Sequence, residues 1–365
     1  MIKRIYIHIP FCSGKKCDYC SFYSEKWTED AEIAFLKKLK DDFINASSSC
    51  GELLSFYIGG GSPSALTAKG LEFLFNAIEK NFKIPGECEI SIELNPEDLD
   101  RTKIALIANF ANRISLGVQS FNDSLLEILG RRAKRKEVLK AIDLIHNEEI
   151  KNFSIDLINS IPGQTLQMYE EDLSMALKCG ITHLSSYSLT IEEGSKLLGK
   201  QLENNLELEM EIWELNDKVL SENAMRRYEI SNFAREGFEC KHNLEIWFGD
   251  KYLGFGPASA SFDGEKRWVE VSDFTNWLNG KPPELDVISP KKRAAEILAF
   301  AFRTVKPWSE EKFFERTSFS LKDFEDILLK LDSESLIKYK GDEVLSTERG
   351  LLLWNSLAEK IITGE

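Results

Sequence analysis

The sequence lacks any apolar run long enough to cross a membrane as a helix. Its N-terminus, MIKRIYIHIPFC, has neither the long apolar core nor the small-residue cleavage site of a signal peptide. No repeat of fixed period and no low-complexity segment stands out. We therefore expect a cytoplasmic protein without a transmembrane segment, for which contact with a membrane surface stays open.

The chain also has no excess of positive charge. The 365 residues contain 46 Lys and Arg against 60 Asp and Glu, which gives a net charge of −14. Such a chain is a poor partner for a phosphate backbone, so we expect no nucleic acid ligand. A hydrophobic content of 43 % is ordinary for a globular protein, and the length suits one large domain with a small one.

The cysteines do not indicate a disulfide framework, because their total of seven is odd and their spacing shows no pairs. Four of the cysteines are scattered and are expected to be small packed residues: Cys50, Cys88, Cys179 and Cys240. The other three, Cys12, Cys17 and Cys20, lie within nine residues of each other.

These three cysteines lie in a loop that follows an expected strand, Ile5 to Ile9. Thiolate ligands favour zinc or an iron–sulfur cluster. A closed structural zinc site needs four ligands, whereas a cluster held by three cysteines leaves one iron free. Phe11, Tyr19 and Phe22 would shield a cluster from water. A zinc knuckle stays open as the alternative.

Strand-like and helix-like stretches alternate along the chain, which predicts a parallel sheet with crossover helices. Six or more such units favour an α/β fold with a partial or full (β/α) barrel, whose chemistry lies at the C-terminal ends of the strands. The expected strands are 5–9, 54–58, 89–94, 113–118, 153–158, 183–189 and 227–230, and the expected helices are 28–44, 71–82, 104–110, 136–146, 166–177 and 202–224.

Polar or flexible residues occupy several of these strand ends. Gly59, Gly60 and Gly61 follow the second strand and allow the backbone to approach a ligand closely. Asp156 lies within the apolar stretch FSIDLI, where a carboxylate is costly unless it is paired or binds a ligand. For Glu93 and Gln119 the residues alone leave a structural role as an equal alternative.

After a plausible linker at residues 279–283 the pattern changes to helices, a hairpin-like KYKGDEVLS and a last helix at 348–362. This order is typical of a small winged-helix-like α+β domain. Residues 291–365 contain 13 Lys and Arg against 14 Asp and Glu, so no basic face for nucleic acid is expected. We divide the chain into a barrel domain with its extension, 1–280, and a C-terminal domain, 281–365.

Several motifs, in the same order, resemble those of the radical S-adenosylmethionine (radical SAM) superfamily. The resemblance is to the HemN/HemW branch, which holds the oxygen-independent coproporphyrinogen III oxidases and the heme chaperones. The motifs are HIPFC, CDYCSF, GGGSPS, ELNP, SLGVQSF, IDLINSIPGQT, HLSSYSLT, KHNLEIW and GFGPAS. They cover residues 4 to about 262 densely. The family leaves three residues between its first two cysteines, whereas four residues, Ser13 to Lys16, lie between Cys12 and Cys17 here.

The resemblance implies a 4Fe–4S cluster bound by Cys12, Cys17 and Cys20, with S-adenosylmethionine as the second cofactor. It also implies binding roles for eleven residues. Those at a first S-adenosylmethionine are Tyr6, Gly60, Gly61, Ser62, Glu93 and Thr190. Those at a second S-adenosylmethionine are Tyr19, Gln119, Arg131 and Asp156, together with Gly61 and Ser62, and the residue at heme is His242.

Details favour the heme chaperones within this branch. The chain begins almost at the cysteine loop, and Phe22 stands where the oxidases have a fourth cysteine. The chaperone motif HNxxYW is present with Ile246 in place of tyrosine, and packing of His242 as a structural residue stays an equal alternative. Two function classes remain open. The protein is either a chaperone that binds heme for acceptor proteins or a radical enzyme acting on a porphyrin precursor.

Overall fold

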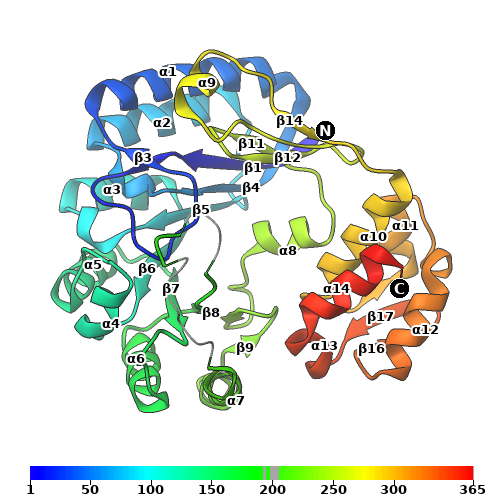
Figure 1. Ribbon diagram of the computed structural model, residues 1–365. Coiled ribbons are helices and arrows are strands. Elements are labelled where there is room, and N and C mark those ends of the chain that lie inside the picture. The colour runs from blue at the N-terminus through cyan, green and yellow to red at the C-terminus, as the bar shows by residue number, and fades with distance from the viewer. Residues whose placement is uncertain (192–194, 198–204, 365) are drawn as a thin grey trace.

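The computed structural model describes residues 1–191, 195–197 and 205–364. In this part of the chain, the largest sheet has nine strands (Figure 1) in the order β11-β1-β4-β5-β6-β7-β8-β10-β9. The strands are β1 (Ile2–Ile9), β4 (Cys50–Gly60), β5 (Glu89–Leu94), β6 (Arg113–Gln119), β7 (Asn152–Asn159), β8 (His183–Ser188), β9 (Arg226–Arg227), β10 (Asn232–Ala234) and β11 (Leu253–Phe255).

The strands from β11 to β8 pair in parallel, and β10 then pairs with β8 and β9 in antiparallel fashion. The sheet ends at β11 on one side and at β9 on the other, so it does not close on itself. The fold is therefore the partial (β/α) barrel that the alternating sequence pattern predicts.

Helices α1 to α6 connect the parallel strands and lie along the outer side of the sheet (Figure 1). They are α1 (Glu29–Ala46), α2 (Ala68–Asn81), α3 (Arg101–Phe110), α4 (Asp123–Ile128), α5 (Arg135–Asn147) and α6 (Leu166–Lys178). Thr28, Thr67 and Thr165 cap α1, α2 and α6, and each side chain accepts a backbone N–H of the first turn. Such caps satisfy donors that a helix start leaves free.

The two faces of the sheet differ in polarity. Alternate residues such as Ile7, Ile58 and Ile92 are fully buried in the main hydrophobic core. The residues between them are mostly polar, for example Tyr6, Tyr57 and Glu93. Because side chains alternate across a strand, the apolar set packs beneath the helices and the polar set faces the barrel interior. The barrel interior is therefore available for chemistry rather than filled with hydrophobic side chains.

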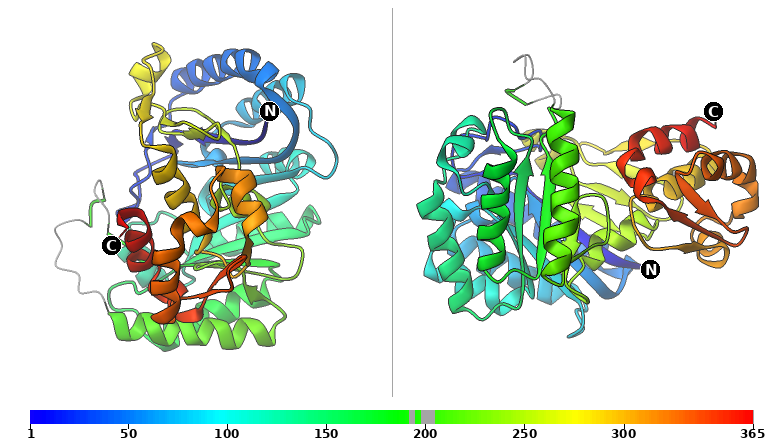
Figure 2. Two further views of the ribbon diagram at one scale, coloured as in Figure 1. Left: turned by 90° about the vertical axis from the view of Figure 1, so that its right-hand side faces the viewer. Right: turned by 90° about the horizontal axis from the view of Figure 1, so that it is seen from below.

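Beyond β8 the chain forms α7 (Leu206–Glu222), α8 (Lys241–Trp247), a small sheet of β12 (Ala260–Phe262), β13 (Arg267–Val269) and β14 (Glu284–Asp286), and α9 (Phe274–Leu278). A separate hydrophobic core then forms around Trp308, Phe313 and Leu328. This C-terminal α+β unit protrudes to one side of the barrel (Figure 2). Its elements are α10 (Pro290–Ala301), β15 (Trp308–Ser309), α11 (Glu310–Thr317), α12 (Glu325–Ser333), β16 (Ile337–Tyr339), β17 (Glu343–Ser346), α13 (Glu348–Leu352) and α14 (Trp354–Thr363).

Some expected elements differ from the observed ones. The single strand expected at 227–230 is wrong, because β9 and β10 form an antiparallel hairpin around a turn there. Glu229 lies in that turn, with no exposed surface, and accepts hydrogen bonds from the Ser231 backbone and the Asn232 side chain. The helix expected at 202–224 begins at Leu206 in the described chain, and residues 202–204 lie outside the described part. Among the described residues, no helix combines the length and the apolar character needed to span a membrane.

Candidate cluster and cofactor site

The cysteine loop lies where β1 ends, at the C-terminal edge of the barrel. Cys12 belongs to the short strand β2 (Phe11–Cys12), which pairs with β3 (Glu25–Lys26). The Asp18 N–H donates to the Leu129 carbonyl at 3.0 Å and so fixes the middle of the loop to the end of α4. The loop is thereby anchored at its start and in its middle before any cofactor binds.

The three thiols of the loop lie near each other. Burial raises the pKa values of Cys12 and Cys20, and the neighbouring Cys17 thiolate raises both further. Among the described residues, no three His, Cys, Asp or Glu side chains are close enough to bind one metal ion. A cluster needs no such convergence, because each cysteine binds a different iron. Three thiols on one loop are thus a donor set that suits a cluster with one cysteine on each of three irons.

The longer gap between Cys12 and Cys17 turns outward. The Lys15 side chain is 60 % exposed and forms an ion pair with Asp18 at 2.9 Å. On the other flank, Arg132 donates to the Ser13 hydroxyl at 2.5 Å. Of the four residues in the gap, Lys15 is exposed, and Ser13, Gly14 and Lys16 are half-buried.

The glycines that end β4 lie directly against the cysteine loop. The Gly61 N–H donates to the Ile9 carbonyl at 2.8 Å. A Cβ atom on Gly61 would lie 2.6 Å from the Phe11 carbonyl oxygen, and Gly60 has a φ of +105°. Both positions therefore need glycine. Ser62 follows, buried, with its hydroxyl 2.7 Å from that of Ser64.

Glu93 ends β5 beside these glycines. Its Oε1 accepts a hydrogen bond from the Tyr57 hydroxyl at 2.6 Å, and the Gly60 N–H also donates to the carboxylate. A Cβ atom on Gly59 would lie 2.7 Å from Glu93 Oε2. Burial raises the pKa of Glu93 to about 7, and the charge of nearby Asp156 adds to that rise. The carboxylate therefore changes charge near neutral pH.

Arg131 connects the cysteine loop to the ends of β5 and β6. Its guanidinium donates to Asn95 Oδ1 at 3.0 Å, to the Gly117 carbonyl at 2.6 Å and to Cys17 Sγ at 3.7 Å. The side chain is 3 % exposed, and Glu97 lies 3.7 Å away. Arg131 is therefore buried, and its hydrogen bonds hold the cysteine loop against the ends of β5 and β6.

Gln119 is the last residue of β6, and Asp156 lies inside the neighbouring strand β7. Gln119 has a φ of +69°, a rare conformation for a residue with a side chain, at a register shift between β6 and β7. Asp156 accepts a hydrogen bond from the Ser115 hydroxyl at 3.0 Å, and burial raises its pKa. Two uncommon features, a strained backbone and a carboxyl group in the barrel interior, thus lie side by side.

Two predicted tyrosines lie near these residues: Tyr6 is close to Glu93, and Tyr19 is close to Arg131 and Asp156. The Tyr6 hydroxyl lies 3.1 Å from His8 Nδ1, and burial raises the pKa of the phenol. Tyr19 packs against the small apolar cluster that includes Leu129 and Ile158. The structure therefore brings together the cysteine loop, the glycines and six predicted side chains: Tyr6, Tyr19, Glu93, Gln119, Arg131 and Asp156.

Two predicted residues lie outside this group. Thr190 is exposed beyond the end of β8, with its hydroxyl 3.4 Å from the Ser188 carbonyl. His242, on α8, is 2 % exposed, and its Nδ1 lies 2.8 Å from the Ser55 hydroxyl. Its ring lies 5.2 Å from that of Tyr57, and burial lowers the pKa of the imidazole to about 3. In this conformation His242 belongs to the barrel interior.

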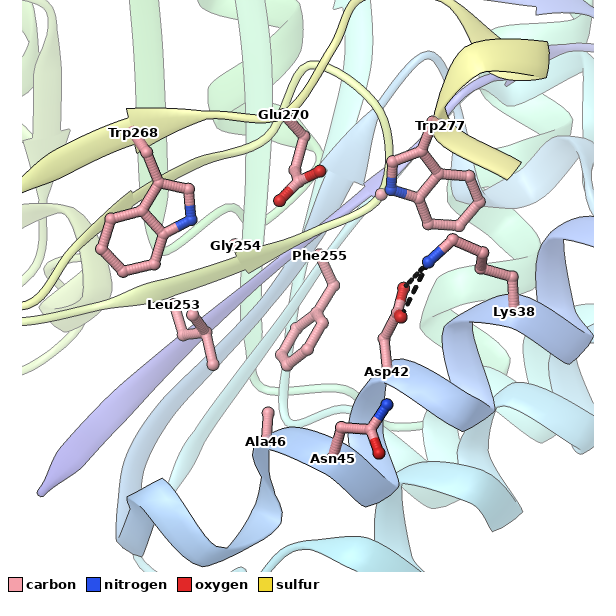
Figure 3. A pocket seen from close by; sticks show the side chains of 11 residues that line it. Lys38, Asp42, Asn45, Ala46, Leu253, Gly254, Phe255, Trp268, Glu270 and Trp277 are labelled. Carbon is pink, nitrogen blue, oxygen red and sulfur yellow. Dashed lines mark hydrogen bonds and ion pairs between the residues drawn. The ribbon is translucent and has the colours of Figure 1, made fainter. Parts of the chain in front are cut away.

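Sequence reasoning missed Tyr57 and Asn95, which hold Glu93 and Arg131. A usable signal exists for Tyr57, since it precedes Gly59 by two residues and so shares the inner face of β4. A further pocket of about 330 Å³ lies between α1 and β11 (Figure 3). It contains the Lys38–Asp42 ion pair and Trp277, and no predicted site residue lines it.

Comparison with known proteins agrees with this geometry. The family model for the radical SAM superfamily matches residues 6–176. The heme chaperone HemW of Lactococcus lactis is 32 % identical over 98 % of this chain and 96 % of its own length. HemW of Bacillus subtilis is 31 % identical, with 98 % of each chain covered. This chain belongs to the HemW family of radical SAM proteins.

The fold agrees with that assignment. The solved structure of coproporphyrinogen III oxidase (HemN) from Escherichia coli superposes with a TM-score of 0.82 at 18 % identity, covering 99 % of this chain and 90 % of the other. Membership of the radical SAM superfamily implies a 4Fe–4S cluster and S-adenosylmethionine. Three free thiols on a loop beside two obligatory glycines are a suitable place for both.

Proposed function

We propose that this protein binds heme and delivers it to acceptor proteins, with a 4Fe–4S cluster and S-adenosylmethionine as resident cofactors. The observation that carries the proposal is the similarity, over nearly the whole chain, to relatives named heme chaperone HemW. The lack of a cysteine at Phe22 supports it, because the oxidases of this branch have one there. Cytoplasm is the proposed location.

Within this proposal, Cys12, Cys17 and Cys20 hold the cluster, and Arg131 hydrogen-bonds the Cys17 sulfur. A guanidinium that donates to a cluster sulfur stabilises its negative charge and shifts its reduction potential upward. When both cofactors are bound, they supply one-electron chemistry at the barrel mouth.

The remaining residues bind S-adenosylmethionine. The first site consists of Tyr6, Gly60, Gly61, Ser62 and Glu93. The second site consists of Tyr19, Gln119, Arg131 and Asp156, with Gly61 and Ser62. Thr190 remains a predicted contact of the first site, and to reach it the exposed segment after β8 would have to move. The Glu93 carboxylate accepts hydrogen bonds from a ligand ammonium group, and the Tyr57 hydroxyl keeps it in place. His242 remains a predicted heme ligand, and to reach the iron it would have to leave its contact with Ser55.

The alternative function is that of a radical enzyme acting on a porphyrin precursor. The strained Gln119 and the adjacent carboxyl group of Asp156 favour it, because perturbed groups at one mouth are typical of catalytic sites. In that case 5′-deoxyadenosine would accumulate when precursor is supplied. A chaperone would bind hemin without that product.

The proposal is tested by anaerobic reconstitution with iron and sulfide, followed by hemin titration monitored by absorption and EPR. We expect four irons per chain and stoichiometric hemin binding, and we expect Cys20→Ser to lose the cluster. Cys50→Ser is the matched control, because Cys50 is a half-buried thiol away from the loop. Absence of hemin binding to a cluster-loaded protein would contradict the chaperone function.

A further inference from the structure

The pocket between α1 and β11 lies at the edge of the nine-stranded sheet, because β11 is the last strand on that side. Its volume of about 330 Å³ is at the lower end of the range of small-molecule sites. α1 forms one side, and the chain around β13 and α9 forms the other (Figure 3). The buried rings of Phe255 and Trp277 give the pocket an apolar wall. A ligand here would be distinct from the cofactors at the barrel mouth.

The lining carries one more negative than positive charge. Its charged residues are Lys38, Asp42 and Glu270. Lys38 Nζ donates to both carboxylate oxygens of Asp42, at 2.8 and 3.0 Å. In the part of the chain that the structure describes, the Glu270 carboxylate has neither a hydrogen-bond nor an ion-pair partner. Burial raises the pKa of Glu270, and the charge of Asp42 raises it further. A bound cation would offset both effects.

Elsewhere in this protein an indole ring and a carboxylate hold a cation together. The Arg227 guanidinium lies 3.3 Å from the centroid of the Trp213 ring, and its Nε pairs with Asp217 at 3.0 Å. The ring attracts the cation through its π face, and the carboxylate accepts its hydrogen bonds. An indole beside a carboxylate is therefore a pair that suits a guanidinium group.

The pocket contains two such pairs, of which one is occupied. Lys38 Nζ lies 4.8 Å from the centroid of the Trp277 ring and pairs with Asp42. The second pair is Trp268 and Glu270, which lie two positions apart at the end of β13 and so share one side of the strand. Both point into the pocket (Figure 3). Among the described residues, no cation lies over the Trp268 ring.

We propose that this pocket binds an alkyl guanidinium group, the chemistry of an arginine side chain, which stacks on Trp268 and pairs with Glu270. A guanidinium suits the pair better than an ammonium group, because it is planar, stacks on aromatic faces and forms two parallel hydrogen bonds with a carboxylate. Free arginine and an arginine residue of a partner protein both present this group. The proposal does not depend on heme binding.

The experiment is a titration of the full chain, with its cluster reconstituted, with N-acetyl-arginine amide, whose single charge is the guanidinium. 5-Fluorotryptophan labelling gives each of the seven tryptophans a fluorine NMR signal, and Trp268→Phe identifies the signal of Trp268. We expect this signal to shift with a dissociation constant of about 1 mM. N-acetyl-citrulline amide has the same shape without the charge, and it should bind about tenfold more weakly.

Variants of the two charged residues should change the affinity in opposite directions. Glu270→Gln should weaken binding of the arginine probe about threefold to tenfold. Lys38→Gln removes a competing cation and should strengthen binding about threefold. Glu265→Gln is the matched control, because Glu265 is exposed between β12 and β13 and does not line the pocket. Equal affinities for the arginine and citrulline probes, or for Glu270→Gln and Glu265→Gln, would overturn the proposal.

Two further probes distinguish the sources of the guanidinium group. Tighter binding of free L-arginine than of the amide would support the free amino acid as the ligand. Tighter binding of a short arginine-containing peptide would support an arginine side chain of a partner protein. A wild type whose Trp268 signal shifts with none of these probes would overturn the proposal, and it would leave the heme-binding function untouched.

Discussion

The Tyr57 hydroxyl donates a 2.6 Å hydrogen bond to Oε1 of Glu93, across the neighbouring strands β4 and β5. This bond favours the charged form of a carboxyl group whose pKa burial raises to about 7. The pair therefore sets the pH at which Glu93 becomes an anion and can bind the ammonium group of a ligand.

Tyr57→Phe should weaken S-adenosylmethionine binding at pH 7 by about threefold to tenfold, the size of the net contribution of a typical hydrogen bond. The pKa of Glu93 should rise, so the pH dependence of the dissociation constant should move to higher pH. Calorimetric titrations between pH 6 and 9 measure both. Tyr339→Phe, in the C-terminal domain, is the control, and equal pH profiles for Tyr57→Phe and wild type would contradict this role.

Glu93→Gln should stabilise the cofactor-free protein at pH 8 but little at pH 5. The folded-state pKa of about 7 lies above the ordinary value of 4.5, so folding favours the protonated form, and its ionisation costs stability as pH rises from 4.5 through 7. The gain at pH 8 should be about 1–3 kcal/mol. Denaturant unfolding at the two pH values measures it, and a gain independent of pH would refute the assignment.

Gly61→Ala should lower both stability and cluster content, because its methyl group would lie 2.6 Å from a backbone carbonyl that cannot move without shifting the cysteine loop. We expect a loss of about 1–3 kcal/mol. Gly86→Ala is the matched control, since a Cβ there meets no atom within 4 Å. Melting temperature and iron content should fall for the first variant alone.

Arg131→Lys should lower S-adenosylmethionine binding and shift the cluster potential downward, because an ammonium group cannot reach Asn95, Gly117 and Cys17 together. Arg132→Lys changes the neighbouring arginine, which is 40 % exposed, and should have little effect. Potentiometric EPR titration measures the reduction potential of the cluster in each variant. Equal potentials in both variants would show that Arg131 does not tune the cluster.

The sequence predicted the barrel and most strand-end residues, because the carboxyl ends of parallel strands meet at one edge whatever the details of packing. It could not predict the partners of those residues. Tyr57 and Glu93 become neighbours only through the register of β4 against β5. The contacts of His242 could not be predicted either, because its partner Ser55 lies 187 residues earlier in the chain and meets it only in the folded structure.

A pocket of about 570 Å³, with Arg227 and Arg303 among its lining residues, could not be predicted either. Its two arginines come from separate elements, and the β9–β10 hairpin that joins them to the C-terminal domain was expected to be a single strand. Side chains assembled by packing between domains leave no fixed spacing in the sequence. For Arg131 the motif predicted a binding role, but only the structure shows that the side chain is buried.

The most direct test of the central claim is an anaerobic assay of one cluster-loaded preparation with S-adenosylmethionine, a reductant and either hemin or coproporphyrinogen III. The account predicts one tightly bound hemin per chain, and it predicts no loss of CO₂ from coproporphyrinogen. Decarboxylation that keeps pace with 5′-deoxyadenosine release, without stoichiometric hemin binding, would contradict it.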